Sequence, residues 1–365
     1  EILYNVDDVK DVRKLVVKGK MNNDDWTRIN MMTGLFSLDL TDTDAESLPR
    51  INPSSFFHKL KLPSGLKKIQ DEALSGTRLD DITLPQSLTS IGYKAFYQTR
   101  IKECSIPDAV NSIGTYAFAE NQTLQKVKYP SSMTSIPSYC FDSCPMLSEM
   151  NIPVGVTDIN SYAFNCAYML NTQIPQTVKM IGERAFYYSK IGELSTTDSV
   201  YIGTEAFRYS SIGDLKTSDN VEILDNAFRN CTQLTNVNLG KNNKIHVEAF
   251  QYCSNLEKVI IGDGVSFWRY TGSSYKYAYT FGNCSSLKEI EFPTTYSYID
   301  FRNMLNNCSS LQKVTFRSPT MVTGDEYKYF FASCNNTLTI RVPKYLVTSY
   351  KLDPYWYNYN IEGFS

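Results

Sequence analysis

The sequence predicts an α/β-type repeat fold, a solenoid in which short stacked units form a parallel sheet. The first observation is an Ala-Phe pair, once replaced by Cys140-Phe141, whose phenylalanines from Phe96 to Phe250 are separated by 22, 23, 23, 22, 21, 21 and 22 residues. The second is that apolar residues alternate in the first half of each unit and then give way to a tight-turn pattern. A unit this short cannot bury its own apolar side chains, so neighbouring units have to stack.

Each unit is predicted to begin with a short strand, as alternating residues such as Val127 and Tyr129 indicate. A proline such as Pro130 follows in many units and ends the strand, because it has no N–H to give to the ladder. The next segment reads Val-Thr-x-Ile-Gly or a close variant, and we expect its glycine to permit the backbone conformation of a corner. The Ala-Phe pair then fits a short helical turn. Stacking places the phenylalanines in one ladder, in which each buried ring contributes roughly 1.5–3 kcal/mol.

The repeating unit has the consensus L-x-x-V-x-I-P-x-x-V-T-x-I-G-x-x-A-F-x-x-C, with good matches at Leu147 to Phe164, Leu124 to Cys144 and Leu79 to Phe96. This pattern resembles the BspA-like leucine-rich repeat family of bacterial cell-surface proteins, over about residues 56–343. The resemblance implies a right-handed leucine-rich repeat solenoid with a parallel sheet on its concave side. It also implies adhesion or host-protein binding, at the level of a class of function.

The two ends of the chain are expected to be caps, because the terminal units would otherwise expose core and a strand edge. Both ends also look like that family, with a helix expected near 24–32 and a short terminal helix after Val342. We therefore divide the chain into an N-terminal cap with irregular repeats (1–55), a solenoid (56–343) and a C-terminal cap (344–365). With no linker between units, the prediction is one continuous domain.

Composition and charge argue against several classes of function. Lysine and arginine number 36 against 38 acidic residues, so the net charge of −2 offers no basic excess for nucleic acid. No apolar run approaches the length of a spanning helix, which predicts no membrane insertion of this chain. The two histidines, His58 and His246, are too few for a multi-histidine metal site. No phosphate loop, G-x-S-x-G or H-E-x-x-H motif occurs, so we predict no enzyme, no cofactor and no metal.

Most of the nine cysteines recur at one position, about three residues after the phenylalanine of the unit. Asn121, Ser189 and Ser210 take the same position in other units. A position that accepts Cys, Asn or Ser predicts a small inward side chain that hydrogen-bonds to backbone in the adjacent turn. Cys104 and Cys140 replace core residues, which predicts two further buried free thiols.

An insert near 262–280 interrupts the repeat, since Phe250 to Phe281 spans 31 residues. We interpret it as a protruding loop or hairpin, because stacking fixes the length of a repeat and such loops often carry function. Its aromatic residues flank an arginine, a combination enriched at binding hot spots. The alternative is that the insert only covers the flank of the solenoid. The candidate ligand-binding residues, from the insert and the neighbouring concave strands, are Trp268, Arg269, Tyr270, Tyr275, Tyr277, Lys258, Glu289 and Glu291.

The outward side chains of the strands offer a second candidate surface. Acids at Glu193 and Asp214 would repel each other unless they are solvated or paired, so this row is either a solvated polar face or an acidic strip for a basic partner or cation.

Taken with the resemblance, these features predict an exported protein, at the cell surface or extracellular, that binds a host protein or glycan. Two alternatives stay open, a carbohydrate-capture protein that uses the exposed aromatics of the insert and a structural spacer module. The sequence does not specify an oligomeric state.

Overall fold

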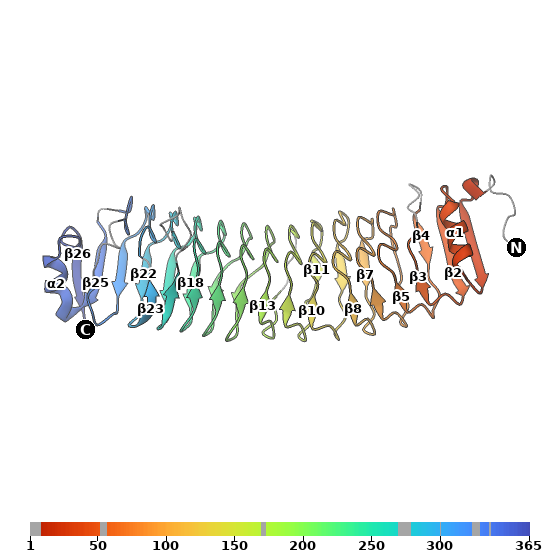
Figure 1. Cartoon of the computed structure of the whole chain (residues 1–365). Helices are drawn as coiled ribbons and strands as arrows, with labels where there is room; N and C mark the ends of the chain where they lie inside the picture. The colour runs from red at the N-terminus through yellow and green to blue at the C-terminus, as the bar shows by residue number, and fades with distance from the viewer. Residues whose placement is uncertain are drawn as a thin grey trace, which may run out of the picture. The chain divides into compact units, whose positions relative to one another are not determined.

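A computed structural model describes residues 9–51, 57–168, 173–268, 279–299, 301–322, 329–335 and 337–365. The chain divides into two compact units, Glu1–Pro175 and Gln176–Ser365. In both, β-strands from successive repeats pair in parallel (Figure 1). The fold is therefore a β-solenoid of stacked coils with few helices.

The first unit begins with a sheet and a helix. Strands β1 (Lys14–Gly19), β2 (Ser37–Thr43) and β4 (Lys59–Lys61) form one parallel sheet, after a short 3-10 helix η1 (Val9–Asp11). Helix α1 (Asn23–Met31) lies between β1 and β2 in the sequence, at the place where the sequence predicts a helix. It begins there because the Asn22 side chain accepts hydrogen bonds from the N–H groups of Asp24 and Asp25.

The rest of the first unit consists of repeats with one or two short strands each. The first strand of these repeats is represented by β7 (Glu103–Ser105), β9 (Lys126–Lys128) and β11 (Glu149–Met150). The second strands are β3 (Ser47–Leu48), β5 (Lys68–Ile69), β6 (Ser90–Ile91), β8 (Ser112–Ile113), β10 (Ser135–Ile136) and β12 (Asp158–Ile159). Equivalent residues pair from one repeat to the next, as Cys104 does with Val127.

The second unit follows the same plan, and its first strands lengthen to four or five residues from β18 onward. Its first-strand sheet has the order β14 (Leu194–Ser195), β16 (Leu215–Lys216), β18 (Asn236–Leu239), β20 (Lys258–Ile261), β22 (Glu289–Phe292), β24 (Lys313–Phe316), β25 (Thr339–Pro343) and β26 (Asn360–Phe364). The second strands in this unit are β13 (Met180–Ile181), β15 (Tyr201–Ile202), β17 (Glu222–Ile223), β19 (Lys244–Ile245), β21 (Val265–Phe267) and β23 (Tyr296–Ile299). A 3-10 helix η3 (Lys344–Leu346) and helix α2 (Val347–Leu352) connect β25 to β26.

The second strand of each repeat was not expected from the sequence. The Thr-Ser-Ile segment before the glycine is only two or three residues long, so its alternation is too short to register as a strand signal. Its isoleucine is nonetheless buried, as Ile91 and Ile136 are, and the residue before it is only partly buried. Many coils thus contain two strands rather than one.

The Ala-Phe segment forms a hydrogen-bonded turn, which differs from the helical turn that the sequence predicts. Two of its residues have left-handed backbone, Lys94 at φ 50° and Gln98 at φ 54° in one repeat, and a helix cannot contain them. The Phe96 N–H donates to the carbonyl of Ala117 in the next repeat at 2.8 Å. The turn therefore bonds to its neighbour along the stack much as the strands do.

The phenylalanine ladder is confirmed, and it forms the centre of the core in each unit. In the first unit Phe96 and Phe118 are fully buried and stack with ring centroids 4.9 Å apart and planes at 6°. In the second, Phe207 and Phe228 stack at 5.0 Å and 3°. The equal spacing of the repeats keeps the rings parallel and offset.

The corner glycine serves a different need from the one that the sequence suggests. Neither Gly92 nor Gly114 has left-handed backbone, so conformational freedom is not the reason for glycine. A Cβ atom at Gly114 would lie 2.4 Å from the backbone nitrogen of Tyr93 in the preceding repeat. The coils approach each other closely at this corner, and any side chain would separate them.

The recurring cysteine position is confirmed as a small inward side chain bonded to a neighbouring coil. The Sγ atom of Cys231 donates to the carbonyl of Phe207 at 3.0 Å, and Cys253 does the same to Phe228 at 3.1 Å. Asn121 makes the equivalent bond to the carbonyl of Phe96 at 2.8 Å. All nine cysteines are free, and seven are buried, Cys104 and Cys140 among them.

Candidate functional site

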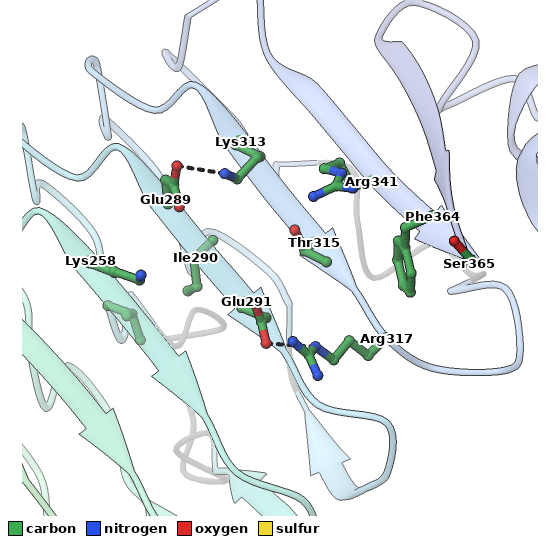
Figure 2. Close-up of a pocket in the computed structure, with 11 residues that line it drawn as sticks. Lys258, Glu289, Ile290, Glu291, Lys313, Thr315, Arg317, Arg341, Phe364 and Ser365 are labelled. Atoms are coloured by element: carbon green, nitrogen blue, oxygen red, sulfur yellow. Dashed lines mark hydrogen bonds and ion pairs between the residues drawn. The ribbon is translucent and has the colours of Figure 1, made fainter. Parts of the chain in front are cut away.

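A hollow of about 290 Å³ lies on the outward face of the long sheet in the second unit. Strand alternation creates its lining, because Val259 and Ile290 point inward and are buried while Lys258 and Glu289 point outward. The polar residues that line it are Lys258, Glu289, Glu291, Lys313, Thr315, Arg317, Arg341 and Ser365. They come from five neighbouring strands and their ends, β20, β22, β24, β25 and β26 (Figure 2).

Two ion pairs hold the carboxylates of the hollow. Glu289 Oε1 lies 2.6 Å from Lys313 Nζ, and Glu291 Oε1 lies 2.6 Å from Arg317 Nε, as Figure 2 shows. Both pairs cross from β22 to β24, where Glu289 and Lys313 are direct register partners. Each carboxylate in the lining is therefore neutralised by a neighbouring cation.

Two cations in the hollow have no such partner. Among the described residues, no carboxylate lies within ion-pairing distance of Lys258 or Arg341. The guanidinium carbon of Arg341 lies 5.8 Å from the centre of the Phe364 ring on β26, and Thr315 on β24 is the register partner of Arg341 (Figure 2). Four cationic side chains and two carboxylate side chains line the hollow, so its side chains together carry a net positive charge.

A second hollow of about 330 Å³ continues the first along the same sheet and shares Lys258 with it. Its charged residues include Glu193, Asp214 and Lys216. Hydrogen bonds from the Thr235 hydroxyl at 2.5 Å and the Asn236 N–H at 3.1 Å lower the pKa of Asp214. This carboxylate is thus held in its charged form by neutral donors.

The predicted site residues separate into groups. Lys258, Glu289 and Glu291 are brought together in the first hollow. Trp268 follows β21 in the other sheet of the same unit and is not part of that lining. The remaining predicted residues lie outside the described part of the chain, and they are Arg269, Tyr270, Tyr275 and Tyr277.

The interpretation of the insert as a loop beginning at Gly262 is wrong for its first part. Val265 and Phe267 are fully buried in β21, which pairs in parallel with β19 and β23. Phe267 packs edge to face against Phe281 of the phenylalanine ladder, with centroids 6.0 Å apart. These residues are the regular second strand of the repeat, so the unusual length is confined to the residues after Trp268.

Trp268 itself is a half-exposed side chain in a fixed orientation. Its Nε1 donates to the Ser266 hydroxyl at 3.1 Å, and its ring stacks on His246 with centroids 6.0 Å apart and planes at 12°. The His246 Nε2 atom lies 3.1 Å from Glu222 Oε1. The tryptophan keeps 45% of its surface exposed, so it offers an aromatic surface at the edge of the second-strand sheet.

A family comparison agrees with this repeat architecture. The model for the BspA type leucine rich repeat region, with six copies, matches residues 52–171, 89–212, 158–278 and 274–362. These matches together cover well over half of the chain. The chain belongs to the BspA-type leucine-rich repeat family. A search of curated proteins finds no match.

Solved structures of other repeat proteins resemble this BspA-type chain. A leucine-rich repeat protein from Bacteroides ovatus is 20% identical, with 97% of this chain and 92% of that one covered and a TM-score of 0.72. The pneumococcal vaccine antigen PcpA is 17% identical, with 91% and 85% covered and a TM-score of 0.48. The first of these similarities shows the fold, and at this level of identity it shows no more.

The BspA-type consensus does not reveal several residues of the hollow. Lys313 begins the regular strand β24 and Arg317 directly follows that strand, so their outward position could be read from the alternation that makes Val314 and Phe316 buried. Arg341 and Phe364 come from β25 and β26, where the spacing of the repeat loosens. No local signal in the sequence indicates that these last strands extend the same sheet.

The described residues contain no group of three or more His, Cys, Asp or Glu side chains that could hold a metal ion. In the same part of the chain, no helix is both long and apolar enough to span a membrane.

Proposed function

We propose that this protein is a cell-surface or secreted binding protein, an adhesin that recognises a host macromolecule through the outward face of its long sheet. The observation that carries the proposal is the charged hollow centred on Glu289 and Glu291. Its carboxylates are held by ion pairs at 2.6 Å, so the charged groups are ordered before a ligand arrives. Membership of the BspA-type family supports a role in binding rather than in catalysis.

The arrangement of polar groups supports a protein ligand over a sugar at this hollow. Among the described residues, Phe364 is the one aromatic residue in its lining, and its ring lies beside the Arg341 guanidinium. Sugar rings generally need an aromatic face on which to stack, whereas arginine beside an aromatic ring is typical of protein interfaces.

Carbohydrate capture remains a second candidate because of one feature, the exposed and oriented ring of Trp268. This tryptophan and the first hollow lie on different sheets, so variants can separate the two functions.

The test is binding of the purified protein to a panel of mammalian extracellular matrix proteins and to a glycan array. We expect binding to at least one matrix protein that is lost in the double variant Lys258→Glu, Arg341→Glu and kept in Trp268→Ala. The matched control is Lys244→Glu, an exposed lysine on β19 of the other sheet. Glycan binding that only Trp268→Ala abolishes would favour carbohydrate capture instead.

The proposed location has its own test. Antibody staining of the source cells should label intact cells as strongly as lysed ones, and labelling only after lysis would contradict a surface location.

A further inference from the structure

The charges on the outward face of the long sheet are divided along its length. The acidic end carries Glu193 and Asp214, beside Lys216, and among the described residues no cation lies within ion-pairing distance of either carboxylate. The basic end carries Lys258 and Arg341, because the carboxylates there are already paired.

Register places these charges on one continuous face. Asn236 pairs with Lys258, which pairs with Glu289, which pairs with Lys313, so outward residues follow one another from strand to strand. The two hollows meet at Lys258. Glu362 is the register partner of Arg341, but it does not line the hollow, and it accepts a hydrogen bond from Asn360. A ligand that crosses the strands therefore meets a net negative charge first, from Glu193, Asp214 and Lys216, and the unpaired cations last.

The middle of this face is neutral and polar. Asn236 and Asn238 of β18 lie between the two ends and line the second hollow. Side-chain amides both donate and accept hydrogen bonds, which suits the N–H and C=O groups of an extended peptide. Five strand steps separate Asp214, which directly precedes β16, from Arg341 on β25, about 24 Å at the usual strand spacing. An extended peptide covers that distance with roughly seven residues.

We infer that this face binds an extended protein segment whose charges are separated, with acidic side chains over Lys258 and Arg341 and basic side chains over Glu193 and Asp214. The inference rests on the proposed function and names the chemistry of its ligand. A uniformly anionic polysaccharide fits less well, because it would meet Glu193 and Asp214 at one end and would compete with Glu289 and Glu291 for their cations at the other.

The test uses two labelled nonapeptides of identical composition in a fluorescence anisotropy titration. One has three aspartates, three neutral residues and three lysines in that order, and the other alternates the charges. We expect the charge-separated peptide to bind at least roughly fivefold more tightly at low ionic strength, a preference that decreases as salt screens the contacts.

Substitutions test whether the preference for the charge-separated peptide arises on this face. The double variant Lys258→Gln, Arg341→Gln should reduce the preference to less than about twofold, and Glu193→Gln, Asp214→Asn should do the same. Lys244→Gln on the other sheet is the control that should retain it. Because all these substitutions are of surface residues, circular dichroism should show unchanged folding.

Three results would overturn the inference, namely equal affinity for the two peptides, no detectable binding of either, or an unchanged preference in the double variant. Tighter binding of a heparin fragment than of either peptide would assign the face to an anionic glycan. A further outcome separates this inference from the proposed function. If the double variant at Lys258 and Arg341 loses matrix-protein binding but the wild type shows no preference between the two peptides, the proposed function stands and the charge-separated ligand is rejected.

Discussion

The cysteine position shows how a single side chain serves each coil. Burial raises the pKa of the thiols of Cys144, Cys231 and Cys284 to about 12. Each thiol donates to a phenylalanine carbonyl of the preceding coil, at 3.0–3.3 Å for these three. The thiols are thus hydrogen-bond donors in a ladder, and the sequence predicted this from the exchange of Cys with Asn and Ser.

These buried thiols should make the folded state less stable at alkaline pH. The unfolded chain releases their protons near the ordinary value of 9.0, whereas the folded chain keeps them until about pH 12. The folded state therefore binds more protons above pH 9, and the free energy of unfolding should fall as pH rises through that range. We expect a lower urea midpoint at about pH 10 than at about pH 7, measured by circular dichroism.

The control for this prediction replaces Cys144, Cys231 and Cys284 with serine, which does not ionise in this range. Serine already takes the equivalent position at Ser189 and Ser210, where both are buried. The triple variant should lose less stability between the two pH values than the wild type. An equal loss in both proteins would show that other groups, such as buried tyrosines, account for the effect.

At the scale of the element, the corner between the second strand and the Ala-Phe turn depends on the absence of a side chain. The backbone of one coil approaches the glycine of the next so closely that a Cβ at Gly114 would meet Tyr93 nitrogen at 2.4 Å. Strand pairing on one side and turn pairing on the other leave little room for the coils to separate.

Gly114→Ala should therefore destabilise the fold, by about 1–3 kcal/mol as for other overpacked sites. The matched control is Gly65→Ala, where a new Cβ would have no atom within 4 Å. Urea denaturation of both variants measures the difference, and equal stability of the two would contradict a steric role for the corner.

The insert gives a second prediction at this scale. Removing the ten residues 269–278 returns the Phe250 to Phe281 interval from 31 to 21, within the range of the regular repeats. We expect this deletion to leave the melting temperature within a few degrees. Removing Val265–Phe267 instead should abolish cooperative unfolding, because a buried strand is lost. A similar melting temperature for both deletions would contradict the assignment of β21 to the core.

The repeat explains which elements could be predicted from the sequence. The first strand and the phenylalanine ladder recur many times, so the period alone defined them. The second strand is too short to show alternation, and the left-handed turn residues, which include Lys94, Tyr116 and Asn226, share no single residue type. In the first hollow, Lys258, Glu289 and Glu291 were predicted from the sequence. Arg341 and Phe364 were not, because they lie where the repeat has lost its regular spacing.

At the scale of the whole molecule, the prediction of one continuous domain is still to be tested. The contacts of the chain group into two compact units that meet in sequence at Pro175 and Gln176. If the repeats form a single domain, calorimetry should show one thermal transition, and limited proteolysis should not cut preferentially near 169–176. Two transitions, together with two protease-resistant fragments that separate at that boundary, would show that the chain forms two domains.

The hydrogen bonds that join neighbouring coils also bear on how genes of this kind can change. In the regular coils, such as those that contain β15 to β18, a coil is bonded to its neighbour along two strands and one turn, and all three sets of bonds connect equivalent residues. Recombination that duplicates or removes one complete repeat leaves every bond with an equivalent partner. A shift of one codon misaligns all three sets together, so lineages should differ by whole repeats, with other insertions confined to places such as the segment after Trp268.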